Sequence, residues 1–245
     1  MKAIILAAGY ATRLYPLTLD KPKALLLIKD KAVVEYTLRK IGDIKEIDEV
    51  FIVTNDKFYD IVNRWVKNNN EKFKFSLKVI NDLTNSNEER LGGIGDLWFC
   101  VEKSNINEDI LILNSDNLFD FSLKDAFDFF QRKKGIVNGI YLVENKEETK
   151  KHGVVELLND KIISFEEKPI EPKTNFTSIG VYFFPEIILP KIKEYLEQGN
   201  NKDAPGNLIK YFLERFNVYG YLFKGKLFDI GNIESYNDAN KVWKG

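Results

Sequence analysis

Short aliphatic runs alternate with helical segments through the first half of the chain, and this alternation constrains the fold most. Three runs have the pattern of strands buried on both faces: Lys2–Ala8 (KAIILAA), Glu49–Asn55 (EVFIVTN) and Asp109–Leu113 (DILIL). Residues 33–44 and 95–104 instead carry apolar side chains at helical spacing. Strands that alternate with helices predict an α/β fold with a mostly parallel central sheet covered by helices.

The second half is richer in strands. Its expected strands and helices, in chain order, are helix 122–134, strands 136–144, 154–158, 161–166 and 176–184, helix 185–198, helix 204–216, strand 218–228 and helix 233–243. The cluster of short strands predicts a small inserted sheet laid against the main one. No linker-like stretch interrupts residues 1–245, so we expect a single domain.

Charge and cysteine content exclude several classes of protein. The chain carries 36 Lys and Arg against 37 Asp and Glu, so no global field draws it to nucleic acid or to an anionic membrane. The single Cys100 excludes an internal disulfide and a Cys-rich zinc site. The apolar run before Arg13 is far shorter than the roughly 20 residues of a membrane span. We therefore expect a cytoplasmic protein, and the sequence leaves its oligomeric state open, a homo-oligomer included.

The turn after the first strand is a candidate phosphate-binding segment. Gly9 closes that strand, and a tight turn there exposes backbone N–H groups at the carboxyl end of the sheet. Arg13 and Lys23 add positive charge at the same place, which together suits a triphosphate. A solvent-facing loop with scattered cations is the alternative. The chain has no P-loop, and the Gly92–Gly95 stretch lacks the features of a dinucleotide fingerprint.

Four segments together resemble the sugar-1-phosphate nucleotidylyltransferases. They are Leu6–Thr18 with Pro22-Lys23, Asn114–Phe119, Glu166–Pro169 and Leu227–Gly231, in the order in which that family carries them. The resemblance covers nearly the whole chain. Within the family, the chain is similar to the short, glucose-1-phosphate thymidylyltransferase-like form without a carboxy-terminal regulatory extension. It implies a Rossmann-like α/β fold with residues 1–116 as nucleotide-binding half, 117–228 as sugar-phosphate-binding part, and 229–245 as metal aspartate and closing helix.

The resemblance also implies roles for individual residues. Catalytic roles fall on Arg13, Lys23, Asp116 and Lys168, and nucleotide binding on Leu6, Ala7, Ala8, Gly9, Tyr10, Ala11, Thr12, Arg13, Lys23, Gly92 and Gly95. Gly153, Glu167 and Lys168 match positions that bind the sugar phosphate. Asp116 and Asp229 match the aspartates that hold Mg²⁺, and carboxylate oxygens are ligands that this ion prefers. Each aspartate is also an ordinary turn residue, which is the alternative for either one alone.

The chain departs from the family pattern in three places. Ala11 replaces the second glycine of the signature, and alanine disfavours a positive φ. The loop around Gly92 lacks the glutamine of thymidylyl enzymes, and the family's sugar-phosphate arginine has no match, Lys202 being the nearest cation. His152, the only histidine, matches no catalytic role, so we expect it to be structural or exposed.

The expected activity is therefore Mg²⁺-dependent transfer of a nucleotidyl group from an NTP to a sugar 1-phosphate, with dTTP or UTP and glucose 1-phosphate first. One alternative is a guanylyl- or cytidylyltransferase that acts on another sugar or alcohol phosphate. The other is a non-catalytic regulator that binds nucleotide sugars. Lys23, Asp116, Lys168 and Asp229 are all present, which favours an enzyme.

Overall fold

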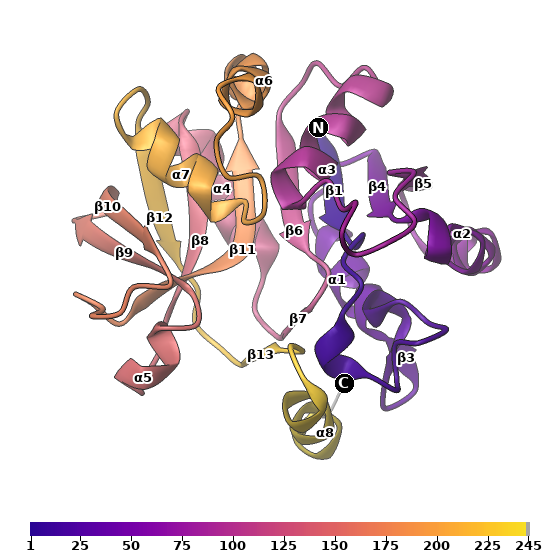
Figure 1. Ribbon diagram of the computed structural model, residues 1–245. Coiled ribbons are helices and arrows are strands. Elements are labelled where there is room, and N and C mark those ends of the chain that lie inside the picture. The colour runs from indigo at the N-terminus through magenta and orange to yellow at the C-terminus, as the bar shows by residue number, and fades with distance from the viewer. Residues whose placement is uncertain (244–245) are drawn as a thin grey trace.

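A mixed nine-stranded sheet runs through the centre of the computed structural model, which describes residues 1–243 (Figure 1). The strands lie in the order β5-β4-β1-β6-β11-β8-β12-β10-β9. In chain order they are β1 Lys2–Leu6, β4 Glu49–Thr54, β5 Ser76–Asn81, β6 Ile110–Asn114, β8 Ile136–Leu142, β9 Gly153–Leu158, β10 Lys161–Glu167, β11 Phe176–Phe184 and β12 Val218–Leu222. Strands β5, β4, β1 and β6 are parallel, whereas β11 runs antiparallel to both β6 and β8. The Rossmann-like α/β fold is confirmed.

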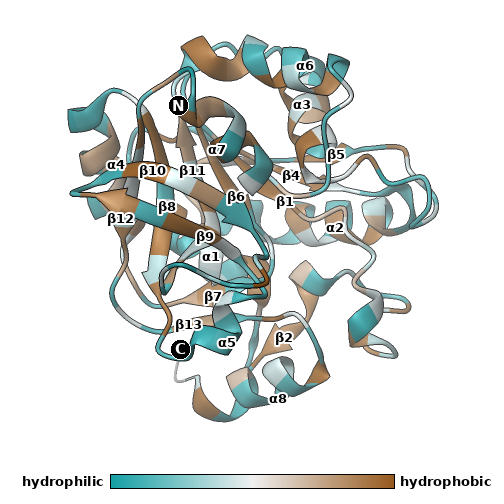
Figure 2. Cartoon of the chain, turned by 60° about the vertical axis from the view of Figure 1, so that its left-hand side comes forward, coloured by the Kyte–Doolittle hydropathy of each residue, from teal (hydrophilic) through white to brown (hydrophobic). Residues whose placement is uncertain are grey.

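Helices cover both faces of this sheet. They are α1 Val33–Ile41, α2 Asp56–Asn69, α3 Gly93–Lys103, α4 Leu123–Lys133, α5 Lys146–Thr149, α6 Leu189–Glu197, α7 Gly206–Leu213 and α8 Ile233–Val242, with 3₁₀ turns η1 Thr12–Leu14, η2 Lys23–Leu25, η3 Asn70–Lys72 and η4 Glu186–Ile188. Side chains of β1 alternate between two cores, as strand geometry requires. Ala3 and Ile5 pack with α1, α2 and α4, whereas Ile4 packs with α3, α6 and α7. In Figure 2 the central strands are largely brown, whereas the helices carry both brown and teal along their length, as helices that pack one side against a core do.

A third, smaller core lies below the carboxyl end of β1 and β6. It joins the first turn (Leu14), the short hairpin β2 Leu27–Ile28 and β3 Lys31–Ala32, strand β7 Asn117–Phe119, and the carboxy-terminal helix α8 through Ala239. Helix α8 begins with a capping box in which Asn232 and Ser235 satisfy each other's backbone N–H groups. Segments from both ends of the chain therefore form one support at the edge of the sheet where a ligand is expected.

Two expectations about the second half differ from the structure. The β9–β10 hairpin is not a separate small sheet, because β10 pairs with β12 and extends the main sheet. The expected strand 218–228 is two strands, β12 and β13 (Leu227–Asp229), separated by a turn in which Gly225 has a φ of +135°. That break lets β13 leave the main sheet and pair with β7.

The charged run 144–151 between β8 and β9 contains the one-turn helix α5. Within residues 1–243, no helix combines the length and the apolar character that crossing a membrane requires.

Candidate active site

Asp116 and Asp229 lie next to each other at the carboxyl edge of the sheet. Asp116 follows β6 and precedes β7, and Asp229 ends β13, the antiparallel partner of β7. The ladder continues one residue further, where the Ile230 N–H donates to the Asp116 carbonyl at 2.9 Å. Asp229 is therefore one position away from the residue opposite Asp116, and the charge of Asp116 acts on the Asp229 carboxyl.

Lys23 is held directly against Asp116. Its Nζ donates to Asp116 Oδ2 at 2.7 Å, with the side chains only 17% and 26% exposed. Pro22 and the buried Ala24 and Leu25 fix the backbone of η2 on both sides of this lysine. The Pro-Lys pair of the sequence therefore delivers a cation to the aspartates from a rigid turn.

Five charged side chains act on one another here, and we call Arg13, Lys23, Asp116, Lys168 and Asp229 the charge cluster. Burial alone would raise the pKa of Asp116, but the charge and hydrogen bond of Lys23, together with Arg13, hold that pKa below its usual value. Desolvation and the Asp116 charge raise the pKa of Asp229, against the opposing fields of Lys23, Arg13 and Lys168. Asp229 remains more than a third exposed, so solvent screens part of this effect.

In the turn after β1, which we call the signature turn, Gly9 has free space beside its Cα. A Cβ placed on Gly9 would meet no protein atom within 4 Å, so nothing inside the fold requires glycine there. Ala11 adopts a left-handed conformation with φ 49° and ψ 44°, although alanine disfavours it, and its carbonyl accepts bonds from Leu14 N–H and Thr18 Oγ1 at 2.9 Å each. The following turn η1 carries Arg13, whose Nη2 lies 3.9 Å from where a Cβ on Gly231 would be.

Buried polar side chains from elsewhere hold this turn. Asn55 Nδ2 donates to the Ala8 carbonyl at 2.8 Å, while its Oδ1 accepts from Phe58 N–H as the N-cap of α2. Tyr10 is buried and its hydroxyl donates to the Thr84 carbonyl at 3.1 Å. The sequence analysis missed Asn55 as a support of the turn, although an asparagine between strand and helix is a usual N-cap signal.

The sugar-phosphate candidates lie where β9 and β10 meet. Lys168 has a φ of +49°, and its N–H donates to the His152 carbonyl at 3.0 Å, which turns the exposed lysine out at the end of β10. Glu167 Oε2 lies 3.0 Å from where a Cβ would stand on either Gly153 or Gly206. Burial raises the pKa of Glu167, and Lys168 opposes that rise. Packing of Phe165 and Glu167 thus explains why position 153 is a glycine.

His152 was missed as a neighbour of the charge cluster. Burial lowers the pKa of its imidazole, and the charges of Asp116 and Lys168 both act on it. The separation of His152 and Glu167 in the sequence does not reveal that His152 lies near the charge cluster, because this proximity depends on the pairing of β9 with β10.

The glycines of the loop around Gly92 pack against other parts of the protein and leave no open surface. Gly92 has a φ of +80°, and a Cβ there would lie 2.6 Å from the Lys202 carbonyl oxygen. Gly93 N–H donates to Asp203 O, and Ile94 N–H to Lys202 O, at 2.9 Å each. A Cβ on Gly95 would meet only Leu91. The backbone of Lys202 therefore packs against this loop, and its charge acts on Asp96.

A buried carboxyl pair lies behind the same loop, and the sequence analysis missed it. Asp82 and Asp96 are 4% and 6% exposed, and Asp82 Oδ1 accepts from both the N–H and the hydroxyl of Thr84 at 2.8 Å. Within residues 1–243, Asp82 Oδ2 and Asp96 Oδ1 have no hydrogen-bond partner. Burial and the charge of Asp82 raise the pKa of Asp96 to about 8, so the Asp96 carboxyl keeps its proton at neutral pH.

The donor set fits a divalent ion that keeps open positions. Asp116 uses only Oδ2 toward Lys23, and Asp229 accepts no hydrogen bond from residues 1–243, so carboxylate oxygens remain free. In the described part of the chain no third Asp, Glu, His or Cys joins them to make a closed metal site. Mg²⁺ is commonly bound by one or two carboxylates and completes its shell with phosphate oxygens and water. The two aspartates satisfy that requirement.

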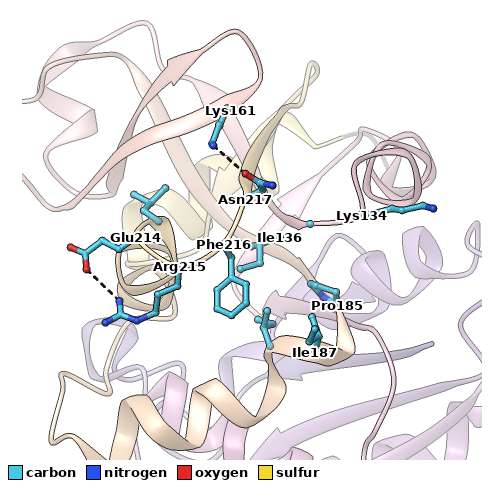
Figure 3. Close-up of a pocket in the computed structure, with 12 residues that line it drawn as sticks. Lys134, Ile136, Lys161, Pro185, Ile187, Glu214, Arg215, Phe216 and Asn217 are labelled. Atoms are coloured by element: carbon cyan, nitrogen blue, oxygen red, sulfur yellow. Dashed lines mark hydrogen bonds and ion pairs between the residues drawn. The ribbon is translucent and has the colours of Figure 1, made fainter.

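The cavity drawn in Figure 3 lies elsewhere. It has a volume of about 460 Å³. Lys161 bonded to Asn217 and Glu214 paired with Arg215 stand on its walls. It opens at the amino ends of β8 and β12, opposite the end of the sheet that carries Asp116. The charge cluster, not this cavity, is the candidate active site.

The comparisons agree with this geometry. The model of the nucleotidyl transferase family matches residues 2–244. A putative mannose-1-phosphate guanyltransferase of Sulfolobus acidocaldarius is 30% identical over 98% of this chain and 62% of its own length. The bifunctional protein GlmU of Methanocaldococcus jannaschii is 27% identical over 98% and 54%. The chain thus spans somewhat more than half of the curated relatives that it matches.

Solved structures are similar over a larger share of their length. A putative glucose-1-phosphate thymidylyltransferase from Bacillus anthracis superposes with a TM-score of 0.85 at 25% identity, covering 99% of this chain and 94% of the other. A UDP-glucose pyrophosphorylase bound to UDP-glucose has a TM-score of 0.81 at 23% identity over 98% and 97%, which supports the fold alone.

Proposed function

The chain belongs to the nucleotidyl transferase family, and on that premise we propose that it transfers a nucleotidyl group from an NTP to a sugar 1-phosphate. One observation carries this proposal. Two aspartates 113 positions apart in the sequence meet at one sheet edge, where the charges of Arg13, Lys23 and Lys168 also act. Two phosphorylated molecules repel each other, and such a convergence of cations offsets that repulsion.

The reaction needs no protein nucleophile. An oxygen of the sugar 1-phosphate attacks the α-phosphorus of the NTP, a new P–O bond forms, and the bond from that phosphorus to the bridging oxygen breaks. Pyrophosphate leaves with the electron pair, and an NDP-sugar remains. The attacking phosphate is already ionised at neutral pH, so positioning and charge neutralisation carry catalysis.

Each member of the charge cluster then has a part. Arg13 would hold the β- and γ-phosphates with its planar fork, and Lys23 the α-phosphate as a point charge. Lys168 would bind the phosphate of the sugar, and Glu167 would accept hydrogen bonds from sugar hydroxyls.

Asp116 and Asp229 would hold Mg²⁺, which when bound neutralises charge that develops on the phosphates. Leu6–Thr12 with Gly92 and Gly95 would surround the nucleotide. We place the reaction in the cytoplasm, where the unpaired, buried Cys100 stays reduced.

Two combinations of nucleotide base and sugar each have an observation in their support. A dTTP or UTP enzyme acting on glucose 1-phosphate has support in the 25% identity to the thymidylyltransferase structure. A guanylyltransferase acting on mannose 1-phosphate has support in the 30% identity to the Sulfolobus relative, and in the loop around Gly92, which lacks the glutamine of thymidylyl enzymes.

A matrix of NTPs against a panel of sugar and alcohol phosphates tests the proposal, with pyrophosphate release as the readout. We expect at least one combination to turn over and to stop when EDTA is added. Calorimetry with NDP-sugars runs in parallel. Tight binding of an NDP-sugar without turnover in any combination would instead identify a non-catalytic regulator.

A further inference from the structure

The ion pair between Lys23 and Asp116 singles out one cation of the charge cluster. Lys23 Nζ lies 2.7 Å from Asp116 Oδ2. Arg13 acts on both aspartates and Lys168 on Asp229, and neither cation forms an ion pair with any residue in 1–243. One carboxylate oxygen that a metal ion would use is therefore already bound to an ammonium.

The geometry lets this ammonium leave without any change of fold. The backbone of Lys23 is fixed by bonds from Leu25 N–H to Pro22 O at 2.9 Å and from Leu26 N–H to Lys23 O at 3.0 Å. The lysine side chain has four rotatable carbons and a compact charge, so it can swing from Asp116 to a phosphate nearby. Asp116 is anchored by the β7–β13 pair and cannot follow.

We propose that Lys23 competes with the divalent ion for Asp116, and that the triphosphate of the nucleotide removes this competition by drawing the ammonium to itself. This inference rests on the proposed function, since it assigns an order of events to the same site. Metal alone then binds weakly, because a cation occupies one of its ligands and repels it. Metal and nucleotide bind with positive coupling, because each favours the state in which Lys23 has left Asp116.

The coupling gives Lys23 two successive partners. In the free protein its charge balances Asp116, which would otherwise be a half-buried carboxylate beside Asp229. In the bound state its charge balances the α-phosphate, and the metal balances the aspartates. No cation is lost from the cluster at either stage, which is why the aspartates can be kept close together in the absence of metal.

Mn²⁺ alone is the probe, titrated without nucleotide and followed by the paramagnetic resonance signal of the free ion. We expect the Lys23→Met variant to bind Mn²⁺ at least tenfold more tightly than the parent protein. Lys23→Arg keeps a cation and should stay within threefold of the parent. A Lys23→Met variant that binds Mn²⁺ as weakly as the parent, or more weakly, overturns the proposal.

Two further variants separate a contact effect from a general loss of charge. Lys168→Met removes a cation that acts on Asp229 but touches no carboxylate, and we expect it to change Mn²⁺ affinity less than threefold. The double variant Lys23→Met with Asp116→Asn should lose the tenfold gain. An equal gain from Lys168→Met would show that net charge, and not the ion pair, governs the metal.

Folding and turnover are checked independently. Should Lys23→Met fail to fold, Lys23→Gln carries the same expectation, because its amide is neutral and does not repel the ion. Mn²⁺ should also raise the melting temperature of the Lys23→Met variant more than that of the parent. A parent protein that turns over substrate while Lys23→Met binds Mn²⁺ no better refutes the competition alone, whereas absence of turnover in every combination refutes the proposed function alone.

Discussion

Asp116 and Asp229 are brought side by side by a backbone ladder, not by an interaction between their side chains. Strands β7 and β13 pair from Leu227 with Phe119 to Asp229 with Asn117, and Ile230 N–H then donates to Asp116 O. The like charges of the two aspartates oppose this arrangement, and the fold maintains it. Such a pair is expected where a cation binds.

Replacing Asp229 by Asn should lower turnover at least a hundredfold. The loss of one preorganised charge contact commonly costs about 3 kcal/mol of transition-state stabilisation. Pyrophosphate release under saturating Mg²⁺ measures the effect. Asp238→Asn is the matched control, because Asp238 lies on helix α8 in an exposed pair with Lys241 at 3.4 Å. Asp229→Asn activity within a few-fold of the control would remove Asp229 from the metal site.

Metal affinity should fall on acidification at a higher pH than for an ordinary aspartate. Metal ligands must be deprotonated, and burial with the Asp116 charge raises the pKa of Asp229 above its usual value. Asp229 therefore gains its proton first as the pH falls. Mn²⁺ titrations of the parent protein at several pH values measure this. Affinity that stays constant down to about pH 4 would contradict the assignment.

Lys168→Met should raise the KM for the sugar phosphate more than the KM for the NTP. Lys168 follows β10, which lies on the other side of β6 from β1 in the strand order, and its charge acts on Asp229. Lys173→Met serves as control, since Lys173 is exposed and pairs with Glu156 at 3.0 Å. Equal changes in both KM values would instead place Lys168 on the nucleotide.

The Asp82–Asp96 pair should make stability decrease with rising pH. Asp96 keeps its proton in the folded protein up to about pH 8, whereas an unfolded aspartate loses it near pH 4. The folded state thus binds the extra proton between these values, and the unfolding free energy falls by up to about 1.4 kcal/mol per pH unit there. Above about pH 8 this contribution is constant.

Urea unfolding of Asp96→Asn tests the sign. The amide is neutral at every pH, so the variant should gain stability relative to the parent as the pH rises from about 5 to 8. A stability difference that does not depend on pH would show that Asp96 does not keep its proton in the folded protein.

Ala11→Gly should stabilise the signature turn. Ala11 has a φ of 49°, and this left-handed conformation costs an alanine about 1 kcal/mol more than a glycine. The greater freedom of glycine in the unfolded chain offsets part of the gain, so we expect up to about 1 kcal/mol by urea unfolding. A loss of stability would mean that the turn is not left-handed at this position.

The sequence predicted the strands and helices of the parallel half well because their patterns are local. Buried strands such as Glu49–Thr54 and N-capped helices such as Asp56–Asn69 follow from a few neighbouring residues. The β12–β13 break was not predicted, because a tertiary pairing of Leu227–Asp229 with β7 outweighs the continuous strand pattern. The β9–β10 hairpin was assigned to a separate sheet for the same reason: its pairing with β12 is non-local.

The sequence likewise predicted only part of the candidate site. Motifs identified Lys23, Asp116 and Asp229, and the structure brings them together. Ala11 was expected to avoid a positive φ, and the turn imposes one nevertheless through the bonds to its carbonyl. The Asp82–Asp96 pair lay outside sequence reasoning, since burial and the raised pKa of Asp96 depend on the packing of α3 against the loop after β5.

A double-variant cycle on Mn²⁺ binding in the presence of a non-hydrolysable NTP analogue tests the central claim most directly. If Asp116 and Asp229 hold one ion, Asp116→Asn and Asp229→Asn should each abolish tight binding of a single Mn²⁺ per chain, and the double variant should be no worse than either. Losses that add independently, or one Mn²⁺ still bound tightly in either single variant, would contradict it.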